Sequence, residues 1–210
     1  MPTNTFFHLP KEKQNRLIHA IRQEFSRVPF EQISINQIIH NANISRGSFY
    51  QYFYNKQDLL QLILHNYQQQ LLTYAKKSLI LHHGDIFNMF EDILNFTVHF
   101  AKDETNQKIY QNLFSDIRIN RDCFLKLYKD NTQQKINEEL LPYIDFTALN
   151  LNEHDDLIYF IDILAAICKE TIAEIFLNLP NYQNTYKNYQ KKLQLLKQNF
   201  TKIKESKIDA

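Results

Sequence analysis

The stretch from residue 46 to residue 56, RGSFYQYFYNK, gathers hydrogen-bond donors that suit a polyanion. Arg46 can donate to guanine O6 and N7, and Gln51 can pair with adenine N6 and N7. Gly47 carries no side chain, so a partner could approach the backbone closely. Hydroxyl groups that can donate to phosphate oxygens come from Ser48, Tyr50 and Tyr52. These residue types predict a surface that contacts double-stranded DNA.

The aromatic residues of this stretch divide between two sides of a helix. At about 100° per residue, Phe49 and Phe53 fall about 40° apart and form one apolar stripe. We expect that stripe to face the core. Tyr50 and Tyr52 are expected to flank the opposite side and to frame an exposed face. Ordinary core or surface packing is the alternative for the aromatic cluster taken alone.

Two polar residues outside the stretch could extend the same surface. Lys56 stands at the start of the following helix, where a cation and the helix N-terminus both favour a phosphate. Asn36 stands at the start of the preceding helix and could reach a flanking base or phosphate. The first 60 residues hold seven Lys and Arg against four Asp and Glu, a local charge of +3 that is a weak indication of a polyanionic partner.

Three helices must position these side chains. Pro10 and a run of apolar residues at helical spacing predict the first helix from about 11 to 27. Ser34 followed by Gln37 is a capping-box pattern, in which each side chain satisfies a backbone donor at the start of a second, short helix. Asn43 tolerates the left-handed backbone of a sharp turn, and Ser45 can cap the third helix.

Two short helices joined by a tight turn and resting on a longer one make a helix-turn-helix. In this setting the chain from about 10 to 60 resembles the DNA-binding signature of the TetR family of bacterial transcription regulators. The matching residues are Ser34, Ile38, Ala42 through Phe53, Asn55, Lys56 and Leu59. The run Gly-x-x-Tyr-x-Tyr-Phe-x-x-Lys is fairly specific. Two positions depart from the family pattern: Asn43 replaces the usual Gly, and Ile39 replaces the usual Ala.

The resemblance implies an all-α fold and a dimer. Residues 1–60 would form a three-helix DNA-binding domain, and residues 61–210 a helical bundle for effector binding and dimerisation. The residues implied to contact phosphates are Ser34, Ser48, Tyr50, Tyr52 and Lys56. Those implied to lie at base edges are Asn36, Arg46, Gly47 and Gln51. A sequence-specific regulator, most often a repressor, modulated by a small effector is the function that follows.

The rest of the chain also has a helical pattern. Only two Gly and five Pro occur in 210 residues, which favours long helices over a β-sandwich or barrel. Helices are expected at about 55 or 56 to 80, and at about 86–101, 106–116, 123–141, 155–179 and 182–203. The last two resemble in position the dimerisation pair of the family, although an internal core helix is the alternative for the first of them.

An effector pocket is expected in the middle of the second domain. Aromatic residues that could line it are Phe96, Phe100, Phe114 and Tyr128, and polar residues that could orient a ligand are His65 and Arg118. Core packing is the alternative for the aromatic residues, and a surface position for the two polar ones. An apolar or aromatic effector is expected first.

Other functional classes find little support. The N-terminus lacks the apolar core of a signal peptide, and no uncharged stretch of about 18 apolar residues occurs, so a cytoplasmic protein without a membrane span is expected. The cluster His82-His83-Gly84-Asp85 lacks zinc-site spacing. No catalytic, phosphate-loop or dinucleotide motif is visible, and we expect no enzyme, metal or cofactor. A dimeric DNA organiser or protein-contact module of the same fold is the alternative function.

Overall fold

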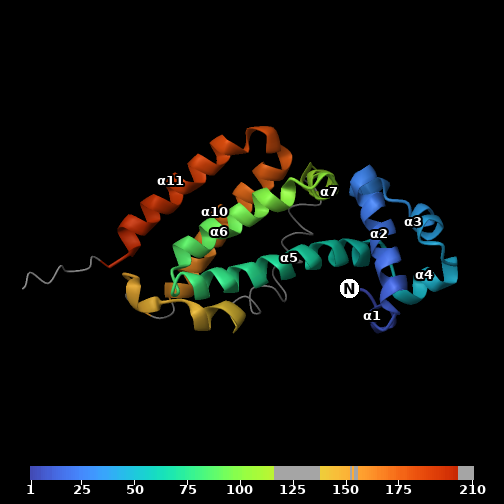
Figure 1. Ribbon diagram of the computed structural model, residues 1–210, viewed down its shortest axis with the longest axis horizontal. Helices are drawn as coiled ribbons and strands as arrows, with labels where there is room; N and C mark the ends of the chain where they lie inside the picture. The colour runs from blue at the N-terminus through green and yellow to red at the C-terminus, as the bar shows by residue number, and fades with distance from the viewer. Residues whose placement is uncertain (116–137, 152, 154–155, 203–210) are drawn as a thin grey trace, which may run out of the picture. The chain divides into compact units, whose positions relative to one another are not determined.

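The computed structural model describes residues 1–115, 138–151, 153 and 156–202 (Figure 1). Within those residues the regular structure is helical apart from one isolated antiparallel bridge between Leu149 and Thr201. The predicted all-α class is confirmed. None of the helices in this described part of the chain is long and apolar enough to cross a membrane.

The described part of the chain contains the predicted helices from residue 11 onward, apart from most of the one at 123–141, together with short helices that the sequence pattern did not predict. In the N-terminal part they are α1 (Asn4–Phe7), α2 (Lys11–Arg27), η1 (Phe30–Gln32), α3 (Ile35–Ala42), α4 (Arg46–Tyr52) and α5 (Lys56–Leu81). They continue as α6 (Ile86–Ala101), α7 (Glu104–Ser115), η2 (Leu141–Tyr143), η3 (Phe146–Ala148), α10 (Asp156–Leu177), η4 (Leu179–Asn181) and α11 (Tyr182–Phe200).

Some predicted bounds need correction. Helix α7 begins two residues earlier than predicted because the Asp103 side chain caps it, with Oδ1 accepting from the Asn106 N–H at 2.8 Å. The segment between the predicted helices 123–141 and 155–179 contains most of η2 and all of η3. Most of the predicted helix 123–141 lies outside the described residues.

Packing divides the chain into two compact units. Among the described residues, the first unit comprises 1–71 and 99–115, and the second comprises 72–98 and the residues from 138 to 202. The start of α5 and the whole of α7 therefore pack with the N-terminal helices. These packing units do not test the predicted boundary after residue 60 between a DNA-binding domain and an effector-binding domain, which stays a prediction.

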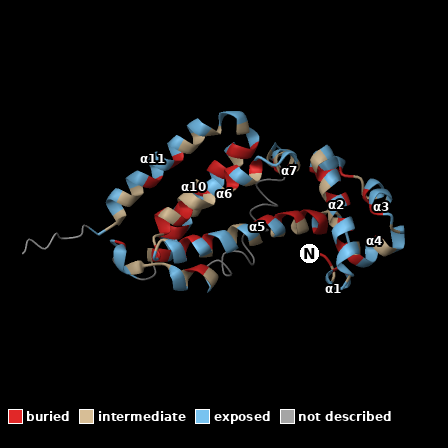
Figure 2. Ribbon diagram, in the orientation of Figure 1, coloured by how far each residue is buried: buried red, intermediate tan, exposed pale blue. Residues whose placement is uncertain are grey.

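Helix α2 is central to the first unit. It packs against α3 and α7, and α1 packs against α4. Figure 2 shows buried segments along α2 and the first turns of α5. The core side chains include Leu17, Ile21, Phe25, Ile38, Phe49, Phe53 and Leu59. The Phe stripe expected to hold α4 down is thus confirmed as core.

In the second unit, α10 and α11 pack against each other, and α11 is tied to α6 because the Tyr189 hydroxyl donates to the Phe90 carbonyl at 2.9 Å. Burial raises the pKa of the Cys168 thiol to about 12, as expected for a core residue. Gly84, at φ 86°, allows a close approach, since an added Cβ would lie 2.4 Å from the Asp145 nitrogen.

Candidate nucleic-acid interface

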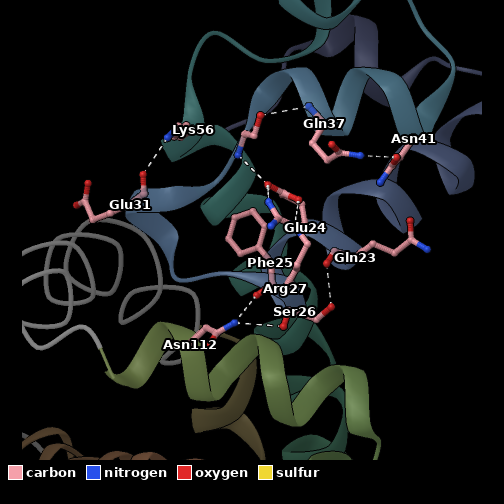
Figure 3. Close-up of polar contacts among 11 residues, drawn as sticks. Gln23, Glu24, Phe25, Ser26, Arg27, Glu31, Gln37, Asn41, Lys56 and Asn112 are labelled. Carbon is pink, nitrogen blue, oxygen red and sulfur yellow. Dashed lines mark hydrogen bonds and ion pairs between the residues drawn. The ribbon is translucent and has the colours of Figure 1, made fainter.

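The N-terminus of α3 is capped, but only half of the predicted capping box is present. Ser34 Oγ accepts from the Gln37 N–H at 3.3 Å, as predicted. The prediction that the Gln37 side chain accepts from the Ser34 N–H is wrong, because this N–H donates to Glu24 Oε1 at 2.8 Å. The Gln37 amide instead donates to Asn41 Oδ1 at 2.9 Å (Figure 3). A carboxylate from α2 therefore fixes the start of α3.

Glu24 is a buried carboxylate that the sequence analysis overlooked. Its side chain is 1 % exposed and accepts two hydrogen bonds from Arg27, at 2.8 and 2.9 Å. Burial alone would raise the pKa of Glu24, but the hydrogen bonds from Arg27 and from the Ser34 N–H outweigh it and leave the pKa below its usual value. The signal was its place in the apolar stripe of α2, beside Ile21 and Phe25.

The turn between α3 and α4 has the predicted geometry. Asn43 adopts the left-handed conformation, with φ 49° and ψ 56°. The preceding carbonyl of Ala42 accepts from Arg16 Nε at 3.0 Å, which fixes the turn to α2. Ser45 Oγ then caps α4 by accepting from the Ser48 N–H at 3.0 Å, and the two hydroxyl oxygens lie 2.8 Å apart.

Three of the predicted DNA-contacting residues form one exposed cluster. Arg46 Nη1 donates to Asn36 Oδ1 at 2.8 Å, and its Nη2 lies 3.4 Å from the Tyr50 hydroxyl. The guanidinium also lies over the Tyr50 ring, 5.6 Å from its centroid. The structure therefore brings Asn36 from α3 together with residues of α4. The contacts hold Arg46 in place and leave all three side chains accessible.

Gly47 and Gln51 are also exposed on α4, and Ser48 is half-buried. A Cβ added to Gly47 would meet only Ser45 Oγ, at 3.9 Å, so the fold itself has room for a side chain at this position. Packing within the chain therefore does not explain the glycine. The predicted place of Gly47 at a base edge stays a prediction.

Tyr52 corrects one expectation. It was expected to frame an exposed face, but its residue is only 3 % exposed. Lys13 Nζ lies 5.5 Å from its ring centroid, and α1 packs against α4. The helical period of α4 could not show that residues from the start of the chain cover this side. Its contact with phosphate stays a prediction.

Lys56, the first residue of α5, is half-buried. Its Nζ donates to the Glu31 carbonyl at 3.2 Å (Figure 3). The Lys56 charge also helps to lower the pKa of Glu24, so it lies near the residues that cap α3. Ser34 and Lys56, both predicted phosphate contacts, are thus linked to the same carboxylate.

Helix α7 is held against α2 by side-chain hydrogen bonds. The Asn112 side-chain amide donates to the carbonyls of Phe25 and Ser26 at 3.0 and 3.3 Å (Figure 3). Nearer the N-terminus of both helices, Arg22 Nη2 of α2 donates to Asn106 Oδ1 of α7 at 2.7 Å. Side-chain amides of α7 therefore hold the C-terminal half of α2.

The predicted effector residues that the structure describes are divided between the two compact units. Phe100 and Phe114 contact Tyr110 in the first unit, with ring centroids 5.6 and 6.4 Å apart. Phe96 contacts Tyr74 in the second unit, at 5.0 Å. His65 lies half-buried on α5 in the first unit. Arg118 and Tyr128 lie outside the described residues.

The predicted dimerisation helices α10 and α11 carry two kinds of apolar residue. Those buried within the chain are Leu157, Phe160, Ile161, Leu164, Cys168, Ile172, Ile175 and Phe176 on α10 and Tyr189 and Leu193 on α11. Those exposed are Ile158, Tyr159, Ile163 and Leu177 on α10 and Leu195 on α11. Most of these apolar residues thus form the core of the chain itself, and a smaller set is exposed.

Comparison with known proteins finds relatives by family and by structure. The family model described as "Bacterial regulatory proteins, tetR family" matches residues 17–63. The model described as "Tetracyclin repressor-like, C-terminal domain" matches residues 85–198, more than half of the chain. No curated protein matches the sequence.

Solved structures show the same fold at low sequence identity. A TetR-family regulator from Syntrophomonas wolfei has a TM-score of 0.65 at 19 % identity, covering 89 % of this chain and 95 % of its own. The dihydroxyacetone kinase operon activator DhaS scores 0.56 at 21 %, covering 92 % and 100 %. The repressor AlkX from Dietzia scores 0.55 at 14 %, covering 91 % and 97 %. With the helix-turn-helix in place and both family models matched, the chain belongs to the TetR family of bacterial transcription regulators.

Proposed function

We propose that this protein is a homodimeric, sequence-specific transcription regulator whose affinity for a palindromic operator is modulated by a small molecule. The observation that carries the DNA-reading part is the exposed cluster of Asn36, Arg46 and Tyr50. Its guanidinium is held by neutral oxygens rather than by a carboxylate. Because those two bonds are weaker than an ion pair, DNA can displace them.

The base-reading roles follow from geometry and chemistry. Arg46 and Gln51 are both exposed on α4. The Arg46 guanidinium offers two parallel donors, and the Gln51 amide offers a donor and an acceptor, so we assign both residues to base edges. Ser34, Ser48, Tyr50, Tyr52 and Lys56 are assigned to phosphates, which set the register without reading sequence. Asn36 and Gly47 complete the surface at the base edges.

A homodimer through α10 and α11 is supported by the apolar side chains that these helices leave exposed. Tyr159 is 69 % exposed and Ile163 is 49 % exposed in the single chain. Two helix-turn-helix units held about one DNA turn apart, roughly 34–36 Å, can read the two halves of a palindrome. Effector binding that changes this spacing would lower or raise the affinity for the operator.

We propose first that the protein represses transcription rather than activating it. We also propose that the effector is a small apolar or aromatic molecule and that the protein acts on DNA in the cytoplasm. Similar structures include one described as a repressor, AlkX, and one described as an operon activator, DhaS. Both have the same fold, so the sign must be measured. A reporter gene placed behind the operator, with and without the regulator, measures it directly.

Selection from a random duplex library tests the DNA-reading proposal. We expect repeated rounds with the purified protein to enrich a palindrome whose half-site centres are about 10 base pairs apart. Recovery of DNA without any enriched sequence would favour the alternative, a DNA organiser. Recovery of no DNA by a folded dimer would favour a protein-contact module. Either of these two results would overturn the proposed function.

A further inference from the structure

The first nine residues form a structured segment that neither matched family model includes, since the first model starts at residue 17. Pro2 and Phe6 are buried, and Asn4–Phe7 forms the short helix α1. Helix α1 packs against α4 (Figure 1). The helical pattern of the sequence predicts a first helix only from residue 11 onward, so α1 is an addition to the predicted fold.

Thr3 holds the C-terminal end of α4 by two hydrogen bonds. Its N–H donates to the Tyr52 carbonyl at 3.0 Å, and its hydroxyl donates to the Gln51 carbonyl at 2.6 Å. The last carbonyls of a helix have no partner within that helix. Thr3 itself stands at the N-cap of α1, where a threonine hydroxyl ordinarily caps its own helix. Here the hydroxyl is directed at α4 instead.

The segment is itself anchored to the core of the first unit. The Phe6 ring lies 5.1 Å from that of Phe53, the residue that follows α4. The Phe6 carbonyl accepts from Gln14 Nε2 at 3.3 Å, and Gln14 is a buried residue of α2. Thr3 therefore links the end of α4 to a fixed support rather than to a loose terminus.

Helix α4 needs such a support. It has seven residues, about two turns, and a helix of this length is marginal by itself. Ser45 fixes its N-terminal end, and Thr3 fixes its C-terminal end, where Gln51 lies. Freedom at the C-terminal end would change the direction in which Gln51 is presented and would act less on phosphate contacts elsewhere.

We propose that Thr3 is a positioning residue for base reading, acting through its hydrogen bonds to the last two residues of α4. The residue need not touch DNA to do so. Because this inference rests on the proposed function, the variants must be compared on two duplexes, the selected palindrome and a scrambled sequence of the same composition.

The test uses three substitutions in the full-length protein. Thr3→Val keeps the shape and removes the hydroxyl, Thr3→Ser restores the hydroxyl, and Thr5→Val makes the same change at an exposed threonine of α1. We expect Thr3→Val to lower the affinity for the palindrome about three- to tenfold, the loss of one hydrogen bond, with little change on scrambled DNA. Thr3→Ser and Thr5→Val should bind both duplexes like wild type.

Hydrogen exchange of the free protein gives a second readout that does not depend on DNA. The Phe53 N–H donates to the Phe49 carbonyl in the last turn of α4, and Thr3→Val should speed its exchange. An equal loss on both duplexes would indicate a structural role only and would overturn the inference. So would a Thr3→Val protein with wild-type exchange and an unchanged preference. If wild type itself shows no preference, the proposed function fails first, and the inference fails with it.

Discussion

The exposed surfaces of α4 and α10 differ in chemistry, although both helices have a well-packed inner side. Helix α4 presents Arg46, Tyr50 and Gln51 to solvent. Helix α10 presents Tyr159 and Ile163 among its exposed residues. Polar donors with fixed geometry suit a charged partner that is itself hydrated. Apolar side chains at a surface suit a partner that removes them from water.

The contrast between α4 and α10 shows that burial must be known before a helix face is assigned a partner. On α4 the helical period separated the Phe stripe from the exposed Arg46 and Gln51, although it did not show that Tyr52 is buried. On α10 both sides carry apolar residues, so the sequence pattern cannot say which faces the core. The structure separates the two sides, since Leu164 and Ile175 are buried within the chain whereas Tyr159 and Ile163 are exposed.

The largest expected effect is on the proposed dimer. Ile163→Glu places a charge among the exposed apolar residues of α10. If that surface is the interface, an unpaired buried charge should weaken the dimer by about 3–5 kcal/mol. Sedimentation equilibrium should show monomers at micromolar concentration. Leu81→Glu is the control, since Leu81 is 71 % exposed and lies at the end of α5. An intact Ile163→Glu dimer would contradict the interface and leave α10 as a core helix only.

Arg46→Ala should have the next largest effect. Loss of a paired contact to a base costs about 1–3 kcal/mol in each half-site, and preference for that base pair should disappear. Gln51→Ala should act in the same way at another position. Anisotropy titrations against duplexes carrying each single substitution measure this. Equal losses on every duplex would remove both residues from base reading.

Lys56→Ala and Tyr50→Ala should weaken binding to all sequences by similar amounts. Each side chain is assigned to phosphate, so its removal changes affinity but not preference. For Lys56→Ala the slope of log affinity against log salt concentration should become shallower by about one for each half-site. An unchanged slope would mean that the Lys56 ammonium makes no phosphate contact.

The smallest effect concerns the carboxylate that caps α3. Because the pKa of Glu24 is lowered in the folded protein, its contribution to stability is present above the ordinary value of 4.5 and is lost as the pH falls through the folded value. Glu24→Gln removes the charge that accepts from Arg27 and should lower the free energy of unfolding at pH 7. The loss should be only about 1 kcal/mol, because Arg27 is partly exposed and its charge is screened by solvent. Denaturation at pH 7 and pH 3 should show the difference between wild type and variant shrink. A constant difference would contradict this role of Glu24.

Local signals predicted much of the DNA-binding unit. The bounds of α2, the left-handed Asn43 and the Ser45 cap depend on neighbouring residues, and all three are confirmed. Glu24 and Ser34, by contrast, are ten residues apart in the sequence, and Thr3 and Gln51 are 48 apart. Helical period and capping patterns contain no information on such contacts. For that reason the burial of Tyr52 and the role of the first residues were missed.

The effector region could be predicted least. Aromatic residues at helical spacing identify core, and Phe100 and Phe114 do contact another aromatic residue of the first unit. Whether a ligand replaces part of such a cluster depends on contacts between helices distant in sequence. No short motif encodes those contacts, and the predicted pocket stays a prediction.

The proposed function depends above all on recognition of the DNA sequence by α4. Fluorescence anisotropy of the wild-type protein with the selected palindrome and with a scrambled duplex, at about 50 and 200 mM salt, tests it most directly. We predict binding to the palindrome at least about 1,000-fold tighter than to the scrambled duplex, with the preference kept at both salt concentrations. Equal affinity for the two duplexes, falling together as salt is raised, would contradict the claim.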